Sequence, residues 1–228
     1  SNKHDIVTAV FIFNSNIFDH KREAQKWWVS KSLENFKSDL KKLNIGLEII
    51  KDDEINFFSK IKSNSKISVY WNKVYEPNEL EKDKKIGTDF SKKNIDFKFF
   101  KGNVLNEYNK ITKNDGTPFK VYSPFWRNAE QFYLERLPDK INKVKKCKKV
   151  NTLFKNQIKS EDILPKSDWY KKFEKYWEPS EQKAHENLDN FVNKSILNYG
   201  VDRDFPSIKG TSLLSPYIRN GQINVGDI

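Results

Sequence analysis

The sequence YGVDRDFPSIKGTSLLSPYIRN occupies residues 199–220, and our interpretation of the whole chain depends on the turn inside it. Gly210 permits a sharp change of direction because glycine tolerates backbone angles that other residues avoid. Thr211, Ser212 and Ser215 then place three hydroxyl groups beside a proline, which suits the first turn of a helix. Hydroxyls and free N–H groups at a helix start can hold an anion. From the residues alone, an ordinary N-cap without a ligand is the alternative.

The order of residues in this stretch resembles the DNA photolyase/cryptochrome family. The similar string has no gap: Arg-Asp-Phe-Pro, three residues, then Gly-Thr-Ser-x-Leu-Ser-Pro-Tyr-Ile-Arg-x-Gly-Gln-Ile. In that family the string opens the helical domain that holds FAD, and the Thr-Ser-x-Leu-Ser turn grips the flavin phosphates. The resemblance therefore implies FAD as the cofactor. The FAD-binding residues that it implies are Tyr199, Thr211, Ser212, Leu213, Leu214 and Ser215.

One of these positions departs from the family pattern, and another has a second possible role. Many family members carry arginine or another polar residue where this chain has Leu213, so we expect only a backbone contact to phosphate there. Tyr199 corresponds to an aromatic residue that borders the flavin, and simple core packing is the alternative. No catalytic residue is expected within this segment, because the family's lesion-binding and electron-relay residues lie in a later helical region.

Composition limits the class of protein. The chain has 228 residues, a net charge of +11 and one cysteine, Cys147. A single cysteine cannot form a disulfide within the chain and suits a reducing compartment, so we expect a cytoplasmic protein. No apolar run is long enough to span a membrane. Methionine is absent, and we expect a piece of a longer protein that is monomeric.

The positive charge suggests nucleic acid as a partner, although it has a second explanation. Nearly all of the excess comes from lysine, and abundant lysine and asparagine can reflect an AT-rich coding bias. For metal ions the sequence offers little, because His4, His20 and His185 are scattered and no cysteine accompanies them. We therefore expect no metal site. Because no apolar run is long enough to span a membrane, we also expect no membrane association.

Apolar runs alternate with helical periodicity through the first hundred residues, which predicts an α/β fold with a Rossmann-like parallel sheet and flanking helices. The expected strands are residues 9–13, 47–50, 67–71 and 95–100, and the expected helices are residues 27–43, 53–62 and 77–93. The glycine pattern of dinucleotide-binding folds and the P-loop are both missing from the sequence. The resemblance identifies this part as the photolyase antenna domain.

The segment Val-Tyr-Trp-Asn-x-x-Tyr-Glu-Pro at residues 69–77 resembles the part of the family that helps to seat an antenna chromophore. Asn78 and Glu79 stand where some members contact a reduced folate, so the resemblance implies an antenna site there. A deazaflavin antenna, or none, stays open. The family usually begins with one more strand carrying an Asp-Leu-Arg motif. That strand and most of the FAD domain are missing, so the resemblance covers the N-terminal half of a typical member.

The expected organisation has three parts: an antenna-type α/β domain at residues 1–120, a connector with a helical segment at 121–178, and the truncated start of an all-α FAD-binding domain at 179–228.

The basic run at residues 140–149 is either a DNA-facing patch or a solvated connector. Ser180 is expected to cap the helix that follows. The expected buried stripe of that helix is Ala184, Leu188, Phe191, Val192 and Ile196.

The resemblance implies a light-driven DNA-repair enzyme, a deoxyribodipyrimidine photo-lyase. In that family the antenna passes excitation to reduced FAD, which donates an electron to a flipped-out pyrimidine dimer in DNA. Arg203 matches a family position near the DNA backbone, and an ion pair with Asp202 or Asp204 is the alternative. A cryptochrome-type blue-light receptor and an isolated Rossmann-like nucleotide-binding module are the other two functions considered. The segment alone is expected to lack repair activity.

Overall fold

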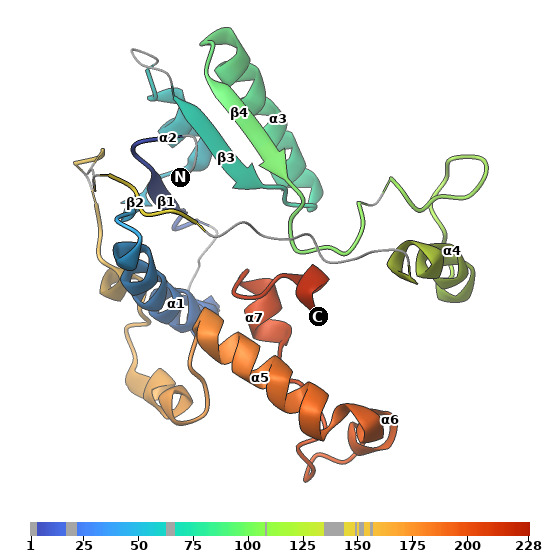
Figure 1. Cartoon of the computed structure of the whole chain (residues 1–228). Coiled ribbons are helices and arrows are strands. Elements are labelled where there is room, and N and C mark those ends of the chain that lie inside the picture. The colour runs from blue at the N-terminus through green and yellow to red at the C-terminus, as the bar shows by residue number, and fades with distance from the viewer. Residues whose placement is uncertain are drawn as a thin grey trace.

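The computed structural model describes residues 4–16, 22–62, 67–107, 109–134, 144–148, 150, 153–155 and 157–228. Strands and helices alternate through its first hundred residues (Figure 1). In chain order these are β1 (Thr8–Phe13), α1 (Glu23–Lys42), β2 (Gly46–Lys51), α2 (Glu54–Ser59), β3 (Ser68–Asn72), α3 (Pro77–Lys92) and β4 (Asp96–Phe100). The predicted α/β class is confirmed, and each predicted element is present within a few residues of its expected bounds.

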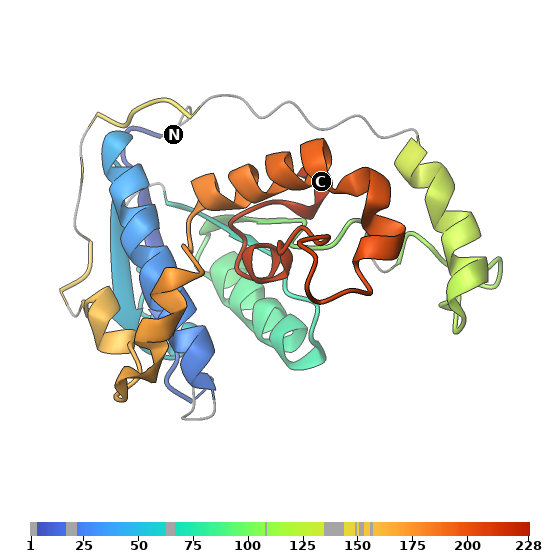
Figure 2. The same ribbon diagram turned by 90° about the horizontal axis from the view of Figure 1, so that it is seen from below.

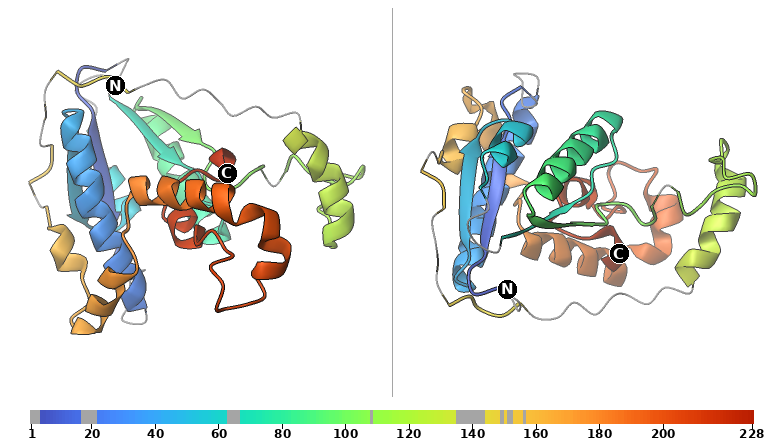
Figure 3. Two further views of the ribbon diagram at one scale, coloured as in Figure 1. Left: turned by 60° about the horizontal axis from the view of Figure 1, so that its bottom comes forward. Right: turned by 90° about the horizontal axis from the view of Figure 1, so that it is seen from above.

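The second half of the chain is helical. Its elements are α4 (Tyr122–Leu134), η2 (Ser160–Ile163), η3 (Asp168–Lys175), α5 (Glu181–Lys194), η4 (Ile196–Asn198), α6 (Tyr199–Asp202), α7 (Ser215–Arg219) and η5 (Val225–Asp227). α4 stands away from the other elements in every view (Figures 1 and 3). The predicted boundaries near residues 120 and 178 stay predictions.

The strands form two parallel pairs within the described residues. β1 pairs with β2 from Thr8 opposite Gly46 onwards, and β3 pairs with β4 from Ser68 opposite Asp96 onwards. We expected one doubly wound sheet, but no described strand joins the two pairs, which are set at an angle to each other (Figure 3). A sheet continues only where backbone N–H and C=O groups of neighbouring strands meet.

Each strand pair carries its own helix and its own apolar core. Leu33 and Leu40 of α1 pack with Ile49 of β2 against the first pair. On the second pair, Phe90 of α3 is fully buried. The close fit of α3 on β4 depends on Gly87, since a Cβ there would lie 3.2 Å from the Phe97 ring. Removal of these apolar side chains from water is the main force that holds helix to sheet.

A third core joins the beginning of the chain to its end. It is built on an aromatic cluster, which we define as Trp27 and Trp28 of α1 together with Phe173, Trp177 and Tyr217. Ring centroids lie 5.4 Å apart for Trp27 and Phe173, and 5.0 Å apart for Trp28 and Tyr217. η3 therefore lies along the beginning of α1 (Figure 2). Residues 169–177 of the connector thus pack onto the α/β unit through Phe173 and Trp177.

The predicted helix after Ser180 is present, but its buried stripe is shorter than expected. Ser180 caps α5, and its hydroxyl accepts a hydrogen bond from the Lys183 N–H at 3.1 Å. Ala184 is fully buried, whereas Val192 and Ile196 are 48% and 47% exposed. The prediction was wrong for these two residues, because periodicity identifies an apolar face but does not supply an element to cover it.

In the basic run, the described residues 144–148 are exposed except for Cys147, and residues 140–143 and 149 lie outside the described residues. Cys147 is buried, and its N–H donates to the Leu43 carbonyl at 2.8 Å. Its own carbonyl accepts from the Asn44 side-chain amide at 3.0 Å. Lys148 forms a 2.7 Å ion pair with Asp5. These contacts hold the chain against the end of α1.

A buried carboxylate, Glu48, fixes the next part of the connector across the outer edge of β2. Glu48 is 2% exposed. Its two oxygens accept the backbone N–H groups of Leu153 and Phe154 at 2.7 and 2.8 Å. The Ile158 N–H then donates to the Ile49 carbonyl at 2.9 Å. Buried charge is costly unless it is hydrogen-bonded, so Glu48 stabilises this arrangement only while the connector stays in place.

We predict that Glu48→Ala lowers the free energy of unfolding by about 1–3 kcal/mol, because it leaves the N–H groups of Leu153 and Phe154 without their acceptors. Urea unfolding measures the loss, and hydrogen exchange should accelerate at the amides of residues 153 and 154. Glu81→Ala, at an exposed position on α3, is the matched control. Equal stability of the two variants would contradict the assigned role of Glu48.

Candidate functional site

The hydroxyl-rich turn is shaped by a close backbone approach at Gly210. This glycine is buried, and a Cβ on it would lie 2.8 Å from the Asp202 carbonyl carbon and closer still to the Asp202 side chain. No side chain fits there without moving the backbone of α6. Glycine is therefore required by space, and the requirement fixes residues 211–215 beside the end of α6.

The turn then passes through a left-handed residue. Leu213 has a φ of +54°, whereas Leu214 has a φ of −84° and a ψ of −15°. Consecutive left-handed and right-handed residues point their N–H groups toward one side, and such a nest is an anion-binding concavity. A left-handed leucine costs roughly 1–2 kcal/mol, and strain of this kind is concentrated at functional sites. The backbone here is consequently suited to phosphate oxygens.

Side chains in the turn divide into two sets. Thr211 and Ser215 are exposed, and Ser212 is half-buried. Leu214 is 2% exposed because its side chain packs in the third core. Only the backbone of Leu214 is available to a ligand. The N-cap of α7 is Leu214 and has no side-chain cap bond, so the hydroxyls do not serve as an ordinary N-cap.

Tyr199 and Arg203 lie on one face of the short helical turn before this site. The Tyr199 side chain is 39% exposed, and its ring meets the Phe191 ring edge-on at 5.6 Å. The Arg203 guanidinium lies 5.7 Å from the Tyr199 ring centroid. Arg203 Nε is 3.7 Å from Asp204 Oδ1, and both side chains are more than half exposed. Such a pair contributes little, so the guanidinium stays available to an anion.

Asn78 and Glu79 occupy the first turn of α3 and differ in accessibility. Asn78 is exposed. The Glu79 carboxylate instead accepts from Lys82 Nζ at 2.8 Å, and Lys82 also pairs with Glu54 at 3.2 Å. Burial acts to lower the pKa of Lys82, but its bonds to Glu79 and Glu54 outweigh this and raise the pKa. A ligand at Glu79 would meet a carboxylate that already has a partner.

Two polar residues near α3 were not identified from the sequence. Asn14, directly after β1, donates its side-chain N–H to Glu54 of α2 at 3.2 Å, and Glu54 in turn pairs with Lys82 of α3. Asp83 Oδ1 accepts the Trp71 indole N–H at 3.1 Å, and burial raises the pKa of Asp83. Neither is part of a motif, because both act through contacts between distant parts of the chain.

The turn and α3 are connected through one exposed ion pair. Arg219 Nη1, at the end of α7, lies 3.8 Å from Glu76 Oε1, directly before α3. The candidate flavin turn and the candidate antenna residues therefore belong to neighbouring elements. A long exposed pair of this kind stabilises this arrangement only weakly.

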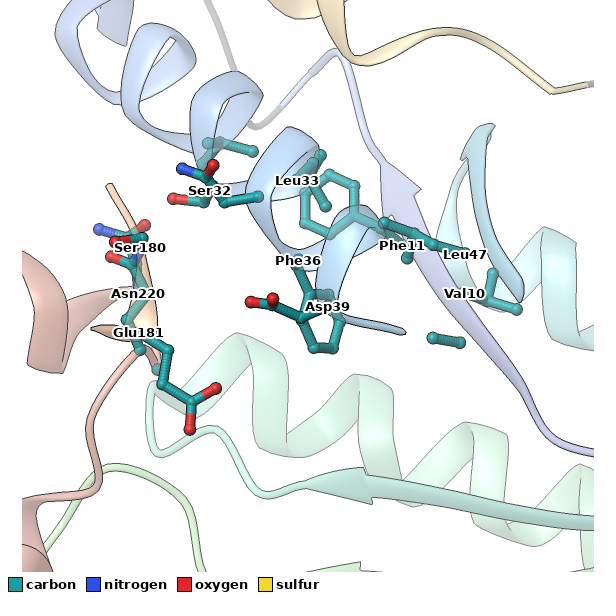
Figure 4. Close-up of a pocket in the computed structure, with 15 residues that line it drawn as sticks. Val10, Phe11, Ser32, Leu33, Phe36, Asp39, Leu47, Ser180, Glu181 and Asn220 are labelled. Atoms are coloured by element: carbon teal, nitrogen blue, oxygen red, sulfur yellow. The ribbon is translucent and has the colours of Figure 1, made fainter. Parts of the chain in front are cut away.

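A cavity of about 290 Å³ lies between β1, α1 and the start of α5 (Figure 4). Its wall is largely apolar and includes Phe11, Leu33 and Phe36. The carboxylates of Asp39 and Glu181 stand at its border (Figure 4). This lining contains no histidine or cysteine and no pairing of nucleophile and base. It offers space without catalytic groups.

Two classes of site are not seen among the described residues. No group of three or more His, Cys, Asp and Glu side chains is gathered there as a metal ion requires. None of the helices in the same part of the chain is long and apolar enough to cross a membrane.

The chain is similar in sequence to known proteins. Residues 1–145 match the family described as DNA photolyase. The deoxyribodipyrimidine photo-lyase of Agrobacterium fabrum is 31% identical over 203 residues, which cover 88% of this chain and 42% of that protein. Cryptochrome-1 of Arabidopsis thaliana is 24% identical over 90% of this chain and 30% of its own length. The chain thus spans less than half the length of both relatives.

A solved structure is similar over nearly the whole chain. The bacterial class III photolyase from Agrobacterium tumefaciens superposes with a TM-score of 0.82 at 29% identity. The superposition covers 96% of this chain and 45% of that protein. The two strand pairs and the C-terminal helices therefore have an arrangement that also occurs in a much longer protein.

We predict that Gly210→Ala destabilises the turn, because the added Cβ collides with Asp202. The expected loss is about 1–3 kcal/mol, as for other overpacked sites, with changed backbone NMR shifts at residues 211–215. Gly200→Ala is the matched control, since a Cβ at Gly200 has no heavy atom within 4 Å. A neutral Gly210→Ala variant would show that the turn does not depend on this close approach.

Proposed function

Because the chain belongs to the DNA photolyase family, we propose that it contributes the antenna-type α/β unit and a flavin-phosphate turn to a light-dependent DNA-repair enzyme. The observation that carries this proposal is the turn at residues 210–215, where Gly210 fits against Asp202 and Leu213 is left-handed. An anion-binding nest bordered by exposed hydroxyls suits a diphosphate. Membership of the family and the anion-binding geometry of the turn both support this proposal.

The residues of the turn fit FAD in separate roles. Bound FAD supplies the one-electron chemistry that splits a pyrimidine dimer. Thr211, Ser212 and Ser215 would donate hydroxyl hydrogen bonds to phosphate, and the N–H groups of residues 213 and 214 would add charge-assisted bonds. Tyr199 would present its exposed ring to the flavin or its ribityl chain. The chain's own contribution is to bind and orient the cofactor.

An antenna chromophore at the first turn of α3 is the second part of the proposal. Asn78 is exposed and can both donate and accept hydrogen bonds. Glu79 would bind the chromophore only if its carboxylate shared or released its ion pair with Lys82. A reduced folate and a deazaflavin are the two chromophore classes considered, and absorption spectra of the purified protein distinguish them. The cytoplasmic, monomeric state that we expect stays a prediction.

DNA that contains pyrimidine dimers is the proposed partner, with Arg203 on its backbone. The Arg203 side chain is more than half exposed, and its ion pair with Asp204 is 3.7 Å long. Arginine suits phosphate because its planar fork can make two parallel hydrogen bonds. The net charge of +11 adds a nonspecific attraction to nucleic acid.

Blue-light signalling is the competing function, favoured by the similarity to Cryptochrome-1. Both functions use an α/β unit and a flavin turn, so this chain cannot separate them by geometry. A repair assay with dimer-containing DNA under blue light can separate them. Repair by a longer protein that contains this chain would support the DNA-repair enzyme over the light receptor. Repair by the 228-residue chain alone would contradict our expectation that the segment lacks activity by itself.

We predict that the triple variant Thr211→Ala, Ser212→Ala, Ser215→Ala binds FAD at least tenfold more weakly, because hydrogen bonds to a charged group contribute about 1.5–3 kcal/mol. Titration of FAD into the purified chain, followed by flavin fluorescence, gives the affinity. Thr88→Ala, an exposed hydroxyl on α3, is the control. Unchanged flavin binding in the triple variant would show that these hydroxyls do not hold the flavin, which is what the alternative of an isolated nucleotide-binding module predicts.

We further predict that Arg203→Ala weakens DNA binding similarly for all sequences and lowers the salt dependence by about one phosphate contact. Fluorescence anisotropy at several salt concentrations measures both quantities. Arg127→Ala, an exposed arginine on α4, is the matched control. If the two variants behave alike, Arg203 is only one of many solvated charges.

A further inference from the structure

The strained turn at residues 210–215 needs support at both of its ends. Leu213 has a left-handed φ of +54°, and a residue with a side chain keeps such a conformation only where the surrounding structure holds it. The far end of the turn is fixed, because the Leu214 and Tyr217 side chains are 2% and 1% exposed in the third core. Whatever fixes the beginning of the turn therefore decides whether the anion-binding nest keeps its shape.

The segment that leads into the turn is a surface loop. Residues 203–209 are all exposed, and this part of the chain returns from α6 beside α5 to reach α7 (Figures 1 and 2). Surface loops are more mobile than the elements that they connect, so contacts at the end of the loop are important. Gly210 fits against Asp202, and directly before it the Lys209 carbonyl accepts a hydrogen bond from the Ser195 hydroxyl at 3.2 Å.

Ser195 is itself firmly placed at the junction of α5 and η4. Its backbone N–H donates to the Phe191 carbonyl at 2.9 Å, and its carbonyl accepts the Asn198 N–H at 3.2 Å. The residue is also half-buried. Because both of its backbone groups are hydrogen-bonded, its hydroxyl can hold Lys209 in a defined position.

The same end of α5 also supports Tyr199. Phe191 and Ser195 are four residues apart, and side chains at this spacing are neighbours on one face of a helix. The Phe191 ring meets the Tyr199 ring edge-on at 5.6 Å. Tyr199 and the hydroxyl turn, which are the two parts of the proposed flavin site, are therefore both in contact with this end of α5.

We infer that Ser195 is a positioning residue of the flavin-phosphate site: its hydroxyl holds the Lys209 carbonyl and so keeps the nest at residues 210–215 in its binding conformation. The inference rests on the proposed function, because its ligand is the diphosphate of FAD. Ser195 acts through the backbone of Lys209 and makes no contact with the ligand. When only a fraction of the molecules has the binding conformation, the apparent affinity falls by that fraction. Loss of the hydroxyl should therefore weaken FAD binding although no contact to FAD is removed.

The first test uses the 228-residue chain without flavin. In Ser195→Ala we expect altered amide NMR shifts at residues 209–215 and a changed backbone coupling constant at Leu213, because this constant depends on φ. Amide shifts in β3 should stay the same, which separates a local effect from general unfolding. Ser195→Thr keeps the hydroxyl and should restore the original signals. Unaltered signals of the turn in Ser195→Ala would overturn the inference.

The second test measures the affinity of the same variants for FAD by flavin fluorescence. Ser195→Ala should bind FAD about three- to tenfold more weakly, as expected for the loss of one neutral hydrogen bond. Ser195→Thr should bind like the unmodified chain, and so should Ser207→Ala, an exposed serine of the same loop that serves as the matched control. Equal affinity of Ser195→Ala and the unmodified chain would overturn the inference and leave the proposed flavin site intact. If the unmodified chain bound no FAD, the proposed flavin role would fail, and this inference with it.

Discussion

The packing of Trp28 at the centre of the aromatic cluster is the interaction on which the rest of the structure depends. Its ring contacts Trp27, Trp177 and Tyr217, and its indole N–H donates to Gln222, 194 residues away in sequence. A residue of the first long helix thus holds the last turn of the chain. Burial of large aromatic side chains supplies the free energy, and the hydrogen bond supplies the register.

The geometry of the hydroxyl turn follows from that packing. Tyr217 is 1% exposed and donates its hydroxyl to the Glu178 carbonyl at 3.1 Å, while burial raises its pKa and favours the protonated form. Leu214 is held in the same core. With these two side chains fixed, the residues before them must turn sharply, and Leu213 takes the left-handed conformation. The strain at Leu213 is therefore supported by the core behind it.

Much of the α/β unit was predictable, because strands and helices leave periodic apolar patterns that do not depend on distant residues. The sequence identified β1 to β4 and α1 to α3, and it identified the hydroxyl turn through its resemblance to a family. It did not predict the division into two strand pairs, since pairing depends on how strands meet in space. It also did not predict Glu48, an acidic residue inside an apolar strand whose acceptors are satisfied by a connector more than a hundred residues later.

By itself, the sequence determined the class of fold, the order of its elements and the residue types in the candidate turn, because these are properties of neighbours along the chain. Tertiary structure alone decided which of those residues are accessible to a ligand. It buried the Leu214 side chain, left Thr211 and Ser215 exposed and paired Glu79 with Lys82. It also left the Trp27 N–H without a hydrogen-bond acceptor among the described residues. The physical reason is that accessibility, ion pairing and hydrogen-bond satisfaction depend on atoms brought together by folding.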